Sequence, residues 1–367
     1  MKVLFLSVTA GQGHNQTGNA VMECLQDNKI DSVMLDTFEY INPVLKESIS
    51  QGYLITTKLT PKLFGRVYRL AEKLEKYDVK LSINKLTNSV LAKKLSNYIE
   101  GYGPDVIVCT HPFSAQILTQ IKTKGIRAKS IGIITDYTIH PFWEETSLDY
   151  YIIANELLTR QAVKKGIPEE RIKPTGIPIH KKFAKKMPAE EARAILNIEN
   201  KDTVLVMSGS MGFGKVPKII KQLDSLDMDF QILSVCGNNK HLYDKIEEMD
   251  LKKKIYNYGF VNNVDIMMDA ANCMISKPGG LTVSESMAKG LPMAIVNPIP
   301  GQEDRNVEFL LNNGLAMKIT KTFPIDEAVY QLLSNSEKVQ SMINQMAKVA
   351  RSKSAMELCK FIMKLDR

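Results

Sequence analysis

The chain of 367 residues has little cysteine, and its pattern excludes two kinds of site. The five cysteines are scattered, and no two of them form a CxxC pair (Cys24, Cys109, Cys236, Cys273 and Cys359). Neither a zinc ribbon nor a redox dithiol is therefore expected. We expect most of these thiols to be buried, small apolar groups in a reducing compartment.

Long apolar runs are absent as well. No stretch approaches the ~20 residues of a membrane-spanning helix. The opening MKVLFLSVTAG is shorter than the apolar region of a secretory signal and leads into a glycine-containing loop. Hydrophobic residues make up 44% and charged residues 24% of the chain, which excludes disordered, collagenous and disulfide-rich classes. We expect a cytoplasmic protein of two to three domains, soluble or peripherally associated with the inner face of the membrane.

Positive charge is concentrated in one segment, residues 58–94. This segment contains ten basic and three acidic residues, so it carries most of the chain's net charge of +8. Its apolar residues recur at roughly helical spacing. A basic amphipathic helix is typical of a segment that lies on an anionic membrane; the alternative is a solvated helix with its apolar face in a core. No nucleic-acid-binding signature accompanies the charge, so no nucleic-acid partner is expected.

Short apolar runs alternate with helical patterns in two halves of the chain. Near-continuous apolar runs are typical of parallel strands covered on both faces, and here they occupy residues 3–8, 32–38, 105–110, 130–135 and 150–155, then 203–209, 230–237, 254–260, 272–277 and 292–297. This pattern predicts an α/β protein of two Rossmann-like, doubly wound domains that face each other across a cleft. We place the domains at 1–178 and 179–353, followed by an amphipathic helix over 354–367.

The second half has three polar or glycine-rich loops at strand ends. SGSMGFGKV (208–216) nearly matches a phosphate-binding P-loop, but Val216 replaces the hydroxyl residue that would hold magnesium. In KPGGLTVSESMAKGLP (277–292), the glycines and the following amides can face a phosphate, and Glu285 can accept from both hydroxyls of a ribose. PIPGQEDRN (298–306) adds Gln302, Glu303, Asp304 and Asn306, which suit sugar hydroxyls. Each loop alone is typical of a solvated turn; together they predict a nucleotide-sugar site.

The first half offers a candidate general base, His14, in the loop after the first strand. Ligands of open α/β sheets bind at this edge, and an imidazole there can act as a base near neutral pH; the alternative is a structural histidine. TDYTIHPFW (135–143) follows another strand, where Asp136 can orient a base and three further residues can line an acceptor pocket: His140, Phe142 and Trp143. His111 also follows a strand and is expected to line the cleft.

In chain order, GQGHNQTGNA, TDYTIHPFW, GIPIHKKF, SGSMGFG, GFVNNVDIMMDAAN, SKPGGLTVSESMAKGLP and PGQEDRN resemble the diacylglycerol glycosyltransferases. That family contains bacterial processive diacylglycerol glucosyltransferases and plant-type monogalactosyldiacylglycerol synthases. The resemblance implies a GT-B fold whose last helix crosses back to the first domain. It also implies inverting transfer of glucose or galactose from a UDP-sugar to diacylglycerol at a membrane surface, giving a β-glycolipid, with no metal or other cofactor.

The resemblance assigns roles residue by residue. His14 is the implied base, and Asp136 occupies an acidic position of the family. The implied donor site has Phe260 and Val261 at uracil, Glu285 at the ribose, and Ser210, Met211, Gly212, Leu281 and Thr282 at the diphosphate. Gln302 and Glu303 would contact the sugar, with Asn306 close by. Gly209, Pro278, Gly279 and Gly280 complete the predicted donor site. The basic segment, including Lys62, Arg66, Arg69 and Lys73, is where the family docks on anionic membrane.

Three alternatives remain from the sequence. One is a UDP-N-acetylglucosamine-dependent transferase that acts on another lipid-linked acceptor, to which the family is also similar. Another is a UDP-sugar epimerase, which needs neither a lipid nor a basic helix. The third is a membrane-docking subunit that binds a UDP-sugar without transferring it.

Overall fold

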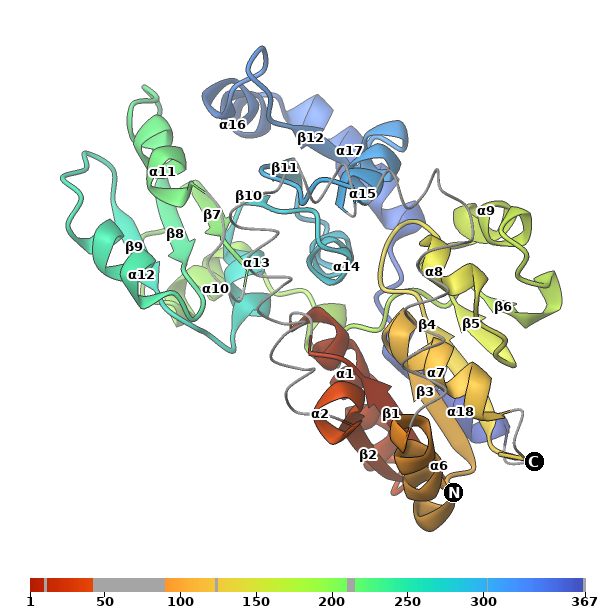
Figure 1. The fold of residues 1–367 in the computed structure, drawn as a ribbon. Coiled ribbons are helices and arrows are strands. Elements are labelled where there is room, and N and C mark those ends of the chain that lie inside the picture. Colours follow the sequence, from red (N-terminus) through yellow and green to blue (C-terminus); the bar gives the residue numbers. More distant parts are fainter. Residues whose placement is uncertain (10–11, 42–89, 123–124, 210–214, 302, 366–367) are drawn as a thin grey trace. The chain divides into compact units, whose positions relative to one another are not determined.

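The chain folds into two compact units, each built on one parallel β-sheet. The structure is a computed structural model that describes residues 1–9, 12–41, 90–122, 125–209, 215–301 and 303–365 (Figure 1). The first unit comprises 1–181, 300–302 and 353–367, and the second comprises 182–299 and 303–352. The prediction of two doubly wound α/β domains is confirmed, and the boundary lies at 181/182 where the sequence places it at 178. The basic segment falls largely outside the described residues.

The first unit contains a six-stranded sheet in the order β2-β1-β3-β4-β5-β6, with every described pair parallel. Its strands are β1 (Lys2–Ser7), β2 (Asp31–Asp36), β3 (Val106–Cys109), β4 (Lys129–Ile133), β5 (Tyr150–Ile152) and β6 (Ile172–Lys173). Its helices are α1 (Gly13–Asp27), α2 (Thr37–Ile41), α6 (Val90–Tyr102), α7 (Pro112–Lys122), α8 (Pro141–Glu144), η1 (Glu156–Leu158), α9 (Thr159–Lys164), η2 (Glu169–Arg171) and α18 (Ser354–Lys364). Because β2 and β3 lie on opposite sides of β1, the strand order reverses between β1 and β3. Such a switch point opens a crevice at the carboxyl ends of the strands.

Side chains from both ends of the chain form the core of the first unit. Val3 and Phe5 of β1 pack in one cluster with Val108 of β3 and with Leu358 and Ile362 of α18. Figure 1 shows α18, in blue, among the red and orange elements of this unit. The strands read as unbroken apolar runs because helices cover both faces of a parallel sheet.

The second unit repeats the architecture with the order β12-β11-β10-β7-β8-β9. Its strands are β7 (Thr203–Met207), β8 (Gln231–Val235), β9 (Ile255–Tyr258), β10 (Cys273–Ser276), β11 (Met293–Ile295) and β12 (Ala316–Lys318). Its helices are η3 (Lys181–Ala184), α10 (Ala189–Ile195), α11 (Val216–Asp224), α12 (Lys240–Glu247), α13 (Val264–Ala270), α14 (Gly280–Lys289), α15 (Glu303–Asn312), α16 (Ile325–Ser334) and α17 (Ser336–Val349). Here the strand order reverses between β7 and β10, so the loops after these two strands meet at the second switch point.

Two expectations from composition can be compared with the structure. All five cysteines are buried and free, as expected. Within the described ranges, no helix is both long enough and apolar enough to span a bilayer.

Candidate functional site

His14 lies in the first turn of α1, at the switch point of the first unit. Its Nδ1 is 2.7 Å from the carbonyl oxygen of Thr110 and 3.2 Å from the hydroxyl oxygen of Thr135. A carbonyl oxygen can only accept a hydrogen bond, so Nδ1 must carry the proton that it donates to Thr110. In the neutral ring, Nε2 therefore carries a lone pair. This is the tautomer that a general base requires.

The surroundings of His14 hold this ring in place and keep it neutral. The Thr110 amide donates to the Leu6 carbonyl over 3.1 Å, and the Thr110 hydroxyl donates to Ser7 Oγ over 3.0 Å. Burial lowers the pKa of His14, and the hydrogen bond to Thr110 partly opposes that shift. No group in the described part of the chain forms a hydrogen bond with His14 Nε2, so this nitrogen remains available to a ligand.

Asp136 does not orient this base. It lies half-buried after β4, whereas the hydrogen bonds of His14 go to Thr110 and Thr135. The expectation that a carboxylate orients the imidazole is corrected: a backbone carbonyl at the end of β3 does so. Sequence spacing carries no signal for this contact, because Thr110 reaches His14 only through the pairing of β1 with β3.

The three residues expected to line an acceptor pocket have different environments. His140 caps α8, because its Nδ1 accepts from the Phe142 amide over 3.1 Å. Phe142 is half-buried, with its ring 5.3 Å from that of Phe113. Trp143 is 3% exposed and packs edge-on against Tyr151 in the core. Trp143 is thus a core residue, which corrects its assignment to the pocket lining.

The two histidines near His14, His111 and His140, both have lowered pKa values. Burial lowers the pKa of His140 to about 3, with a smaller effect of the positive charge of Lys165. Burial also lowers the pKa of His111 well below its usual range. Near neutral pH, this edge of the sheet therefore presents uncharged imidazoles beside phenylalanine rings, a surface suited to an uncharged ligand.

At the switch point of the second unit, a glycine follows β7 and two glycines follow β10 (Gly209, Gly279 and Gly280). Gly209 has a φ of +70°, a conformation that favours glycine. Gly279 is the N-cap of α14, so the amides of Gly280, Leu281 and Thr282 belong to its first turn, where an anion is stabilised. Ser210, Met211, Gly212 and Gln302 lie outside the described residues.

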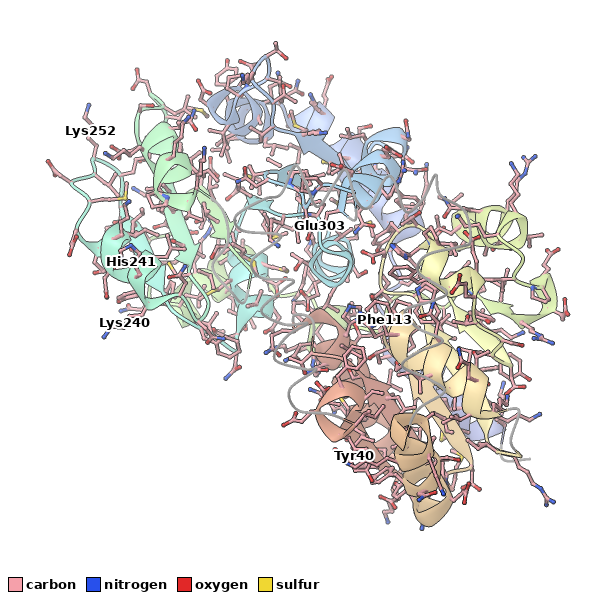
Figure 2. All side chains as sticks on the ribbon, in the orientation of Figure 1. Tyr40, Phe113, Lys240, His241, Lys252 and Glu303 are labelled. Carbon is pink, nitrogen blue, oxygen red and sulfur yellow. The ribbon has the colours of Figure 1, made fainter. Side chains whose placement is uncertain are left out.

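Glu303 and Asn306, at the start of α15, are largely occupied by the protein itself. Glu303 Oε2 accepts from the Ile299 amide over 2.7 Å, and Figure 2 labels its side chain. Asn306 has no exposed surface and donates to the Pro278 carbonyl over 2.9 Å. Asn306 therefore holds the loop before α14, and its predicted place near the sugar stays a prediction.

Lys277, which directly follows β10, is a residue of this site that the sequence motifs did not single out. Its Nζ is 3.5 Å from Glu303 Oε1. Its Cε lies 3.8 Å from the place that a Cβ would take on Gly209. A mostly buried cation thus adjoins the turn after β7 and the glycines that precede α14. The signal was present in the sequence, because Lys277 opens the KPGG motif.

Glu285 is the most perturbed acid of this unit. It is 9% exposed and has no hydrogen-bond partner among the described residues. Burial raises the pKa of Glu285 to about 8, while Lys182 lowers it and Asp265 raises it to smaller extents. Unpaired buried carboxyls are rare because charge burial is costly, so this environment suits a ligand that donates hydrogen bonds.

Lys182 and Asp265, the two charged residues near Glu285, also anchor the loop after β9. Lys182 forms an ion pair with Asp265 over 3.3 Å and donates to the Asn262 carbonyl. Phe260, just before this anchor, is 55% exposed, and Val261 is half-buried. An exposed phenylalanine on an anchored loop can pack against a planar ring such as a nucleobase.

Two family models match the sequence of this chain. The monogalactosyldiacylglycerol (MGDG) synthase family model matches residues 14–179, and the glycosyltransferase family 28 C-terminal domain matches 203–359. The chain is a glycosyltransferase that is similar to the diacylglycerol glucosyltransferases over nearly its whole length. One relative of the enzyme is a processive diacylglycerol beta-glucosyltransferase from Bacillus pumilus, 28% identical over 352 residues, which cover 94% of this chain and 90% of the relative.

Solved structures show the fold of the enzyme. MurG from Acinetobacter baumannii superimposes with a TM-score of 0.64 at 14% identity, and 99% of each chain is covered. A UDP-GlcNAc 2-epimerase from Neisseria meningitidis, bound to UDP-GlcNAc, has a TM-score of 0.60 at 14% identity and covers 99% of this chain and 100% of its own. The predicted GT-B architecture is confirmed. A transferase and an epimerase share it, so the fold alone does not identify the reaction.

Proposed function

We propose that the enzyme transfers glucose from UDP-glucose to the free hydroxyl of diacylglycerol, with inversion at the anomeric carbon. The observation that carries this proposal is the 2.7 Å contact of His14 Nδ1 with the Thr110 carbonyl, from which we infer a lone pair on Nε2 at a strand switch point. The names of the curated relatives support glucose as the hexose and diacylglycerol as the acceptor. Galactose is the second candidate, on the name of the matching synthase family.

In the proposed glycosyl transfer, one proton moves, one bond forms to the acceptor oxygen, and one bond to UDP breaks. His14 Nε2 takes the proton of the acceptor hydroxyl as its oxygen attacks the anomeric carbon. The bond from that carbon to the diphosphate oxygen breaks, and its electron pair leaves with UDP. Attack opposite the leaving group, through an oxocarbenium-like state, gives the β-glycoside.

The donor is held by the second unit in this proposal. Glu285, as a carboxylate, accepts from the ribose hydroxyls, and the loop of Phe260 and Val261 meets uracil. The amides of the first turn of α14 and the ammonium of Lys277 face the diphosphate, where negative charge develops. This arrangement supports a leaving-group site that works without a metal ion.

Docking on an anionic membrane is the remaining part of the proposal. It rests on sequence charge: the segment 58–94 carries ten basic residues against three acidic ones. Each basic residue near an anionic leaflet contributes about 1 kcal/mol of attraction. The acceptor is a lipid, so docking would bring the enzyme to its substrate.

The test is UDP release from UDP-glucose, UDP-galactose and UDP-N-acetylglucosamine in EDTA. Each donor is supplied with diacylglycerol in phosphatidylglycerol vesicles, with diacylglycerol in phosphatidylcholine vesicles, or with vesicles that lack diacylglycerol. We expect release from UDP-glucose that requires diacylglycerol and is faster on the anionic vesicles. Release only from UDP-N-acetylglucosamine, or none that depends on diacylglycerol, would contradict the proposal; loss of activity in EDTA would contradict its metal-free part.

His14→Ala tests the base directly. We expect turnover to fall by roughly 10²–10⁴-fold, the usual contribution of a general base, while UDP affinity measured by calorimetry stays unchanged. His241→Ala is the matched control, because His241 is exposed on α12, where Figure 2 labels it. Near-normal turnover of His14→Ala would exclude His14 as the base.

A further inference from the structure

A second imidazole stands beside the base and has no part in the mechanism above. His111 follows β3, and its ring centroid lies 4.7 Å from that of His14 at an interplanar angle of 72°. The side chain is largely buried, at 9% exposure. The two rings meet because β1 and β3 are neighbours in the sheet.

The backbone determines the tautomer of His111 as well. The Phe113 amide donates to His111 Nδ1 over 3.2 Å, so Nδ1 carries the lone pair. In the neutral ring the proton is therefore on Nε2. Burial, together with the positive charge that His14 and His140 can carry, lowers the pKa of His111 well below its usual range and keeps it neutral.

The two histidines therefore offer a ligand opposite hydrogen-bonding groups, an acceptor and a donor. His14 offers a lone pair at Nε2, and His111 offers an N–H at Nε2, for which the described residues provide no acceptor. The backbone of His111 is fixed, because Ser114 Oγ lies 2.7 Å from its carbonyl and 3.0 Å from that of Leu6. Phe113, labelled in Figure 2, packs against the ring of His111 with centroids 5.0 Å apart.

A donor beside a base suits a ligand that has an acceptor next to its reacting hydroxyl. A hydrogen bond donated to the attacking oxygen itself would withdraw electron density from the nucleophile. The carbonyl oxygen of a neighbouring ester is a non-reacting acceptor within the same small molecule. The uncharged, aromatic surroundings of the two rings match such a glyceride ester.

We propose that His111 donates its Nε2–H to the ester carbonyl oxygen adjacent to the reacting hydroxyl, so that His111 selects glyceride esters as acceptors. The inference rests on the proposed function, because it needs transfer to a glyceride hydroxyl. His111 is thereby a residue that binds the acceptor and positions its hydroxyl against His14.

The test compares two acceptors that differ only at this carbonyl. These are 1,2-dioleoylglycerol and its analogue in which an ether replaces only the sn-2 ester, each in mixed phosphatidylglycerol and phosphatidylcholine vesicles with UDP-glucose. For the wild-type enzyme we expect kcat/KM to favour the ester by about tenfold, the upper range for one neutral hydrogen bond.

Two substitutions test separately the Nε2–H donor of His111 and the contact of His111 Nδ1 with the Phe113 amide. His111→Asn keeps an oxygen that can accept from the Phe113 amide but removes the Nε2–H, so the ester preference is expected to fall to about one with Tm unchanged. His111→Gln keeps an N–H near the place of Nε2 but loses the contact to Phe113, so the preference is retained while Tm falls. His241→Asn, on an exposed helix face, is the control.

The results of this experiment distinguish failure of the inference about His111 from failure of the proposed function. An ester preference that survives His111→Asn, or one that falls only in step with Tm in both variants, would overturn the inference and leave the proposed function intact. A wild-type enzyme that transfers to neither glyceride would overturn both.

Discussion

Hydrogen bonds to the backbone determine which ring nitrogen carries the proton in His14 and in His111. His14 donates from Nδ1 to a carbonyl, and His111 accepts at Nδ1 from an amide. Two imidazoles 4.7 Å apart therefore differ in which ring nitrogen carries the proton. The local sequence around His111 favours this state, because the amide two residues later is a common partner of a polar side chain. For His14 the deciding oxygen lies 96 residues away.

Because Glu285 is proposed to bind the ribose, we expect uridine binding to depend on pH. Its pKa of about 8 leaves the carboxyl neutral at pH 7 before a ligand binds. Only the carboxylate accepts from both ribose hydroxyls, so the affinity for uridine is expected to rise by roughly tenfold per pH unit between pH 6 and pH 7.5. Uridine is the probe because it has no phosphate that titrates. Calorimetry at several pH values measures the change.

Glu285→Gln should bind uridine with an affinity that does not vary with pH over this range, and Glu337→Gln, an exposed control, should behave as the wild type. The same shift lowers the stability of the ligand-free protein as pH rises from about 4.3 towards 8, because the unfolded carboxyl is ionised there and the folded one is not. A pH-independent affinity of the wild-type enzyme would remove Glu285 from the ribose site.

At the scale of single elements, α8 is held to β4 by one large side chain. Trp143 packs over Gly132, where a Cβ would lie 2.7 Å from the indole ring. Glycine is therefore required in β4 for the indole to approach the sheet. This contact fixes the segment that contains His140 and Phe142.

Trp143→Phe is expected to lower the free energy of unfolding by about 1–3 kcal/mol, because a cavity is left against β4. Denaturant unfolding measures this change. The KM for diacylglycerol, measured well below Tm, should change by less than about twofold if the indole does not touch the acceptor. A large rise in KM with unchanged stability would instead return Trp143 to the acceptor pocket.

At the scale of the whole molecule, the last helix completes the first unit. Leu358 and Ile362 of α18 have no exposed surface and pack with Val3 and Phe5 of β1. The first unit therefore combines the N-terminal half of the chain with the C-terminal helix, which supplies part of its core.

Leu358→Ala is expected to destabilise the first unit by about 2–5 kcal/mol, the usual cost of such a cavity. Hydrogen exchange should accelerate in β1 and β3 and stay unchanged in β7 and β8. Met356→Ala is the control, because Met356 lies on the same helix and is 38% exposed. Equal acceleration in both units would show that the two units unfold together.

The sequence by itself determined the α/β class, the two units, most strands and the strand-end loops that contain the candidate site residues. These properties follow from short apolar runs and from glycines at strand ends. Two short strands, β6 and β12, were not predicted, because Lys173 and Lys318 interrupt their apolar runs. The similarly short β5 and β11 lie within longer apolar runs and were predicted. Positions after predicted strands also identified His14 and Glu285 as candidates, and the family resemblance implied the same roles for them.

Tertiary structure alone decided what several of these residues do. Strand order brings the Thr110 carbonyl to His14 in place of Asp136, and places Lys277 between Gly209 and Glu303. Packing turns Trp143 and Asn306 inward. The physical reason is common to all of them: tautomer, charge state and exposure depend on which distant backbone groups and side chains surround a residue, and neighbours in the sequence do not specify that.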